Sequence, residues 1–140
     1  MSSLITISSN EQCESRLRQA IQEAYSINRA FFAFKPKRPI HVIVCRSRAQ
    51  WQTECQEYYH PRAVGVVLRD GTMVVKSPTL CRLKWFKYKR VLRHEMNHAF
   101  WVQLMGPSQV WSPFWLLQPQ CWHPEVHPVL NLRCGHSHRF

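Results

Sequence analysis

The chain has 140 residues, 45% of them hydrophobic, which suits a single domain with a buried core and excludes an intrinsically disordered chain. Nineteen Lys and Arg residues against eight Asp and Glu residues give a formal net charge of +11. Such a charge favours anionic partners, nucleic acid among them. It is not concentrated in one long block, however, so an ordinary basic protein is the simpler interpretation.

The N-terminus and the cysteines bear on the cellular compartment. Residues 1–6 lack the basic segment and the long apolar segment of a signal peptide. No window of about 20 residues is free of charge and helix breakers, so the sequence predicts no membrane span. The six cysteines form no Cys-x-x-Cys pair, which argues against a zinc ribbon or a redox dithiol. We therefore expect a cytoplasmic protein with free thiols, and we expect Cys45, Cys55 and Cys81 to lie in the core.

The first half of the chain alternates between helical and strand-like patterns. Residues 10–28 carry apolar side chains at helical spacing and predict a helix, which Ser9 or Asn10 can cap. The β-branched run Ile40–Cys45 predicts a short, central strand. Ser47 then caps a second predicted helix, which runs to about residue 59.

The second half predicts a hairpin followed by a long helix. Residues 63–68 and 72–76 are strand-like, and Arg69-Asp70-Gly71 between them signals a turn, because Asp-Gly accepts positive φ at low cost. Residues 83–104 then show helical spacing, which Gly106-Pro107 ends. From about residue 108 the periodicity fades. The end of the single domain, residues 1–140, is therefore either an irregular functional segment or a truncated or frame-shifted tail.

The long helix contains the sequence His94-Glu95-Met96-Asn97-His98, which is the motif richest in chemistry. Two histidines four residues apart project from one helix face, where their imidazole nitrogens can meet one Zn²⁺ at about 2.0–2.1 Å. Glu95, on the flank of that face, is placed to accept a proton from an attacking water and to pass it to a leaving amine. The alternative is a surface helix with two solvated histidines.

The motif and the elements before it resemble the gluzincin zinc metallopeptidases of the minimal, peptidase-MA-like type, over roughly residues 39–118. The likeness rests on the order helix, strand, helix, hairpin, and on residues 91–99 with the HExxH core. It implies an α+β, zincin-like fold, in which a small sheet with an edge hairpin packs on the active-site helix. It also implies a Zn²⁺ cofactor and hydrolysis of a peptide or protein substrate. That substrate would pair with the edge strand at Val64, Gly65 and Val66.

The same resemblance places a third metal ligand downstream, at a Glu in a segment of the form P-x-W-x-x-E-G. Residues 113–119 fit that frame, but Gln118 stands where Glu is expected, and a proline stands where Gly is expected. A neutral amide is a poorer zinc ligand than a carboxylate. Glu125 is the alternative ligand, as the remaining carboxylate side chain after the motif, and His123 and His127 are further candidates. The departure leaves open a second hypothesis, an inactive metal-binding module of the same fold.

A second family resemblance concerns the site helix. Residues 92–99 are also similar to the active-site helix of SprT-like proteins, whose association with DNA would suit the positive charge of this chain. The downstream His-Gly pair and cysteine ribbon of that family have no convincing match here. A basic, nucleic-acid-associated SprT-like protein is therefore the other alternative to a peptidase.

Basic and aromatic residues gather at the start of the site helix. Lys and Arg are densest in residues 84–93, which also contain three aromatic residues. Trp85, Phe86 and Tyr88, with Trp101 further along, could form a base-stacking surface beside these charges. We expect the aromatic side chains to pack the helix into the core instead, and the charges to form its solvated face.

Overall fold

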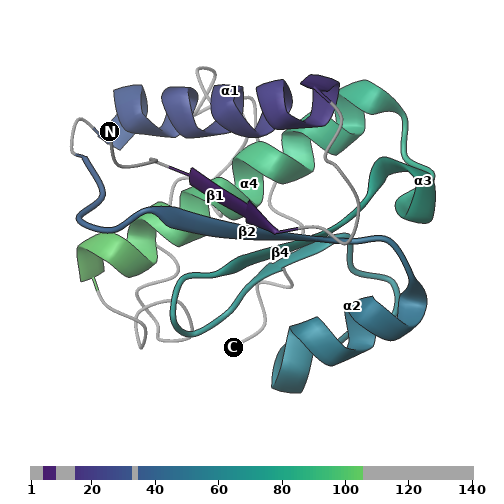
Figure 1. The fold of residues 1–140 in the computed structure, drawn as a ribbon. Helices are drawn as coiled ribbons and strands as arrows, with labels where there is room; N and C mark the ends of the chain where they lie inside the picture. Colours follow the sequence, from purple (N-terminus) through teal and green to yellow (C-terminus); the bar gives the residue numbers. More distant parts are fainter. Residues whose placement is uncertain (1–4, 9–14, 33–34, 106–140) are drawn as a thin grey trace, which may run out of the picture.

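The chain folds into an α+β arrangement, as predicted. The computed structural model describes residues 5–8, 15–32 and 35–105 (Figure 1). In chain order their elements are β1 (Ile5–Ser8), α1 (Ser15–Phe32), β2 (Ile40–Cys45), α2 (Arg48–Cys55), a 3₁₀ turn (Gln56–Tyr58), β3 (Gly65–Val67), β4 (Met73–Lys76), α3 (Pro78–Cys81) and α4 (Trp85–Met105).

The strands form one small mixed sheet in the order β1-β2-β4-β3. The pairs β1–β2 and β2–β4 are parallel, and β3 pairs antiparallel with β4. The prediction that β2 is central is therefore confirmed, since it has a neighbour on each side. Strand β3 is an edge strand of the described sheet, and it contacts α4.

Helices cover both faces of the sheet. Helices α1 and α4 pack on one face, and α2 packs on the other (Figure 1). Because successive strand residues point to opposite faces, Val42 and Val44 enter the larger core with α1 and α4. Cys45 enters the smaller core beneath α2. Strand β2 is thus apolar on both sides, which explains its continuous hydrophobic run.

Local sequence signals account for most element boundaries. The hairpin turn is confirmed: Gly71 adopts φ 93°, and the backbone N–H of Thr72 donates to Asp70 Oδ1 at 2.9 Å. Ser47 caps α2 as predicted, by accepting a hydrogen bond from the backbone N–H of Gln50. That helix ends at Cys55 rather than near residue 59, because Gln56 takes φ 54° and the chain continues as a 3₁₀ turn.

The loop that leads into β3 is fastened to the α2 side of the sheet. Trp51 Nε1 donates to the carbonyl of His60 at 3.0 Å, and Lys76 Nζ donates to the carbonyl of Pro61 at 2.7 Å. The Lys76 ammonium also lies 5.2 Å from the centre of the Trp51 ring. These contacts fix where the edge strand begins.

The described cysteines agree with the expectation of core thiols. Cys45 and Cys55 are fully buried and Cys81 is half-buried, and none of the three forms a disulfide. Burial raises the pKa of Cys45 to about 11 and that of Cys55 to about 12. Both buried thiols are therefore protonated at neutral pH and are poor nucleophiles.

No helix within the described ranges combines the length and the apolar character that crossing a membrane requires.

Candidate active site

Both histidines of the motif lie in α4, and both are buried. His94 and His98 expose only 6% and 4% of their surface. Their ring centres are 4.9 Å apart, with an angle of 72° between the ring planes. This is the arrangement expected of residues i and i+4 on one helix face. The burial is incompatible with the alternative of two solvated histidines.

Glu95 lies against the edge strand. Its side chain is only 7% exposed, and it fills the space where a side chain at position 65 would be. A Cβ atom built on Gly65 would lie 2.6 Å from Glu95 Cγ and 3.2 Å from Glu95 Cδ. Gly65 is therefore the residue that lets β3 approach the carboxylate-bearing face of α4.

The other two residues predicted on the edge strand have structural contacts of their own. The carbonyl of Val64 accepts a hydrogen bond from the backbone N–H of Lys76 at 2.9 Å. Val66 pairs in register with Val74, and its side chain packs against the smaller core. Of the three, Gly65 is the one whose missing side chain faces the motif.

A buried amide pair ties α4 to α1 beside the motif. Asn97 Nδ2 donates to Asn28 Oδ1 at 2.9 Å. Asn28 Nδ2 donates to the carbonyls of Ala24 and Arg93, at 2.9 and 3.3 Å. Both amides are completely buried, so these bonds fix the register of the two helices just before His94. Sequence reasoning missed the pair, although Asn28 continues the helical spacing of the buried Ile21 and Ala24.

The described part of the chain supplies two donors suited to zinc. Neutral imidazoles are common zinc ligands, and the two rings lie close enough to share one ion, so these residues fit the metal. Among residues 5–8, 15–32 and 35–105, no group of three or more His, Cys, Asp and Glu side chains is arranged to hold a metal. The other predicted ligands, Gln118 and Glu125, and the candidates at 123 and 127, lie outside the described residues.

The aromatic residues near the start of α4 divide between core and surface. Trp85 stacks on Tyr88 with ring centres 5.8 Å apart, and Arg16 of α1 lies 4.0 Å above the Trp85 ring. Tyr88 is buried, and its hydroxyl donates to the carbonyl of Lys76 at 2.6 Å. Phe86 was expected in the core, but it is 52% exposed, because two residues of helix turn it by about 200° from the buried Tyr88.

Comparisons with protein-family models, with curated proteins and with solved structures found no match to this chain.

Proposed function

We propose that the chain is a zinc-dependent metallopeptidase with a zincin-like fold. The observation that carries the proposal is the buried pair His94 and His98, one helical turn apart, with Glu95 enclosed between the site helix and the edge strand. Two imidazoles and a carboxylate gathered in one buried place are uncommon in an ordinary protein core. Such a group of side chains is typical of a metal site with a general base.

The arrangement of the elements supports the zincin-like part of the proposal. The resemblance calls for a small sheet whose edge hairpin packs on the active-site helix. Here β3 is the last strand of the described sheet, runs antiparallel to its neighbour β4, and contacts α4. The backbone groups of residues 64–66 that face away from β4 would pair with an extended peptide or protein substrate.

His94 and His98 would hold the Zn²⁺, with Glu125 or Gln118 as the third protein ligand. When bound, zinc supplies Lewis acidity, which polarises a carbonyl and lowers the pKa of a water towards about 7. Glu95 would accept the proton of the attacking water and deliver it to the leaving amine. The absence of a side chain at Gly65 would let Glu95 keep its position beside β3. The amide pair Asn28–Asn97 would keep α4 in register with α1.

One observation favours a second candidate, a metal-binding module of the same fold that does not hydrolyse peptides. Gln118 stands where the resemblance calls for Glu, and an amide oxygen holds zinc less tightly than a carboxylate does. Both candidates bind metal through the histidine pair, but only the first hydrolyses peptides. They therefore require separate measurements of metal content and of hydrolysis.

The test compares three forms of the full chain after reconstitution with zinc. Metal analysis should give about one zinc per wild-type chain, and the double variant His94→Ala, His98→Ala should bind none. Glu95→Gln should retain the metal and lose hydrolysis of a mixed peptide library. A wild type that takes up no zinc would refute both candidates. A wild type that binds zinc but hydrolyses no peptide would support the metal-binding module. Full activity in Glu95→Gln would overturn the role of that residue.

A further inference from the structure

A row of basic side chains leads along α4 to the histidine pair. Lys87, Arg90 and His94 follow one another at spacings of three and four, which places them on one face of the helix. Lys87 is exposed, Arg90 is partly exposed, and His94 is buried. At about 1.5 Å of rise per residue, Arg90 lies roughly 6 Å and Lys87 roughly 10 Å from His94 along the axis.

The charge of this row is not neutralised by its own segment. Residues 82–93 hold six Lys and Arg residues and no Asp or Glu. Arg90 lies 5.7 Å from the centre of the exposed Phe86 ring, which carries no net charge. The start of α4 therefore presents positive charge beside the proposed active site.

We infer that the substrate is an acidic peptide segment, whose carboxylates contact Lys87 and Arg90 while its backbone crosses the histidine pair. This inference rests on the proposed peptidase function and adds the substrate class. An extended chain advances about 3.3 Å per residue. The offsets of roughly 6 and 10 Å therefore place the acidic side chains about two and three residues from the scissile bond.

A peptide fits this surface better than a nucleic acid does. Single-stranded nucleic acids are bound on several aromatic rings whose faces are open to the bases. Among the described residues of this part of α4, Trp85 is covered by Arg16 on one side and stacks on Tyr88, so Phe86 is the exposed ring there. The row also leads to the buried pair, where a cleavable group would lie.

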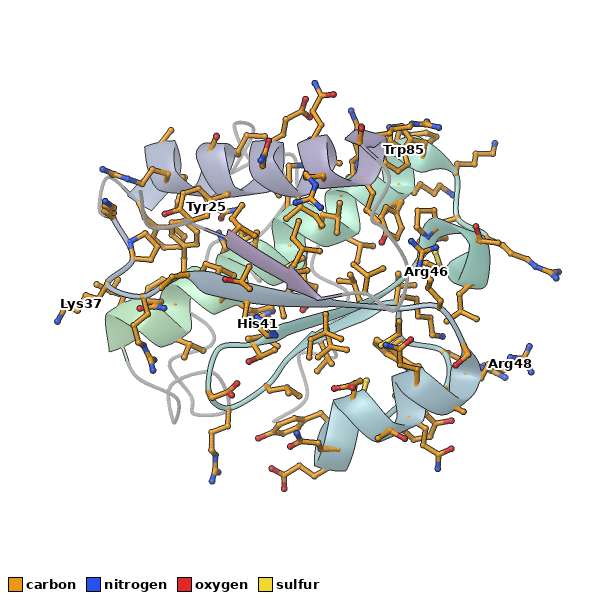
Figure 2. The ribbon with its side chains drawn as sticks, in the orientation of Figure 1. Tyr25, Lys37, His41, Arg46, Arg48 and Trp85 are labelled. Atoms are coloured by element: carbon orange, nitrogen blue, oxygen red, sulfur yellow. The ribbon has the colours of Figure 1, made fainter. Side chains whose placement is uncertain are left out.

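The experiment uses matched peptides and matched variants of the zinc-loaded full chain. One peptide carries Glu at the second and third positions on either side of the cleaved bond, and its partner carries Gln there. The double variant Lys87→Gln, Arg90→Gln removes the two positive charges of the row. The control Lys37→Gln, Arg38→Gln removes the same two residue types from exposed positions at the far end of the molecule; Lys37 and Trp85 mark the two ends in Figure 2.

The wild type should cleave the Glu peptide at least tenfold more efficiently than the Gln peptide at low salt, through KM rather than kcat. The preference should shrink at high salt, because exposed charges are screened. It should disappear in Lys87→Gln, Arg90→Gln and persist in the control. Equal cleavage of both peptides by the wild type, or an undiminished preference in the row variant, would overturn the inference.

A binding measurement separates this inference from the peptidase proposal. Fluorescence anisotropy with the Glu95→Gln chain reports capture of the labelled Glu peptide without turnover. Capture that depends on Lys87 and Arg90 supports the acidic ligand even if no form of the chain hydrolyses peptides. A single-stranded oligonucleotide that binds more tightly than the Glu peptide and displaces it would overturn the inference in favour of nucleic acid.

Discussion

Replacing Gly65 with alanine tests whether the edge strand positions the carboxylate. The new methyl group would lie 2.6 Å from Glu95 Cγ, 3.2 Å from Glu95 Cδ and 3.3 Å from Val75 Cγ1. The first distance is shorter than any ordinary carbon–carbon contact, so Glu95 or the strand must move. Since the Cγ atom is near the backbone end of the side chain, rotating the carboxylate alone does not relieve the clash.

The expected cost follows from overpacking. Extra methyl groups in well-packed sites cost about 1–3 kcal/mol, while Gly→Ala recovers about 0.4–1 kcal/mol by restricting the unfolded chain. We expect Gly65→Ala to lower the free energy of unfolding by about 1–2 kcal/mol, and the melting temperature by on the order of 5 °C. A general base displaced by about 1 Å should lower kcat roughly a hundredfold.

The assay combines thermal unfolding, zinc content and peptide hydrolysis. Zinc content should be unchanged, because the three atoms nearest the new methyl group belong to Glu95 and Val75 and not to a histidine. Val66→Ala is the matched control, since it alters the same strand on the face turned towards α2; it should lose some stability and keep kcat. In a Glu95→Ala background the Gly65→Ala change should lose most of its cost, because the Glu95 Cγ and Cδ atoms are absent and the 3.3 Å contact with Val75 Cγ1 remains. An undiminished penalty in that background would refute the reasoning.

The remaining predictions concern the buried polar groups. Asn28→Leu should lower the free energy of unfolding by about 2 kcal/mol, because it leaves the buried Asn97 amide without its partner. In urea unfolding, the double variant Asn28→Leu, Asn97→Leu should lose less stability than the sum of the two single variants. Strict additivity would contradict the coupling between the two amides. For Cys55, burial raises the pKa from 9.0 to about 12, so the folded chain holds its proton longer than the unfolded chain. The thiol's contribution to stability should therefore be intact below about pH 9 and decline as the pH rises towards 12. Cys55→Ala should show a shallower decline of the free energy of unfolding over that range, and an identical pH profile would contradict this assignment.

Local patterns predicted the elements that depend on near neighbours. The strand β2, the Asp-Gly turn of the hairpin and the helix that carries the HExxH motif all rest on interactions within a few residues along the chain. Strand β1 was missed because its four residues carry too short a pattern, and it is a strand through its parallel pairing with β2. The short helix α3 was missed as well, since it is a single turn of four residues that Ser77 caps by accepting a hydrogen bond from the backbone N–H of Leu80.

For the candidate site, the sequence by itself determined that His94 and His98 share a helix face with Glu95 on its flank, because the helical repeat alone decides that spacing. It did not determine that the three side chains are buried, nor that Gly65 makes room for Glu95. Nor did it pair Asn97 with Asn28, which lies 69 residues earlier in the chain. Those features were decided by the tertiary structure, since burial and close approach depend on which distant segments pack together, and a periodic pattern records only that a residue faces inward.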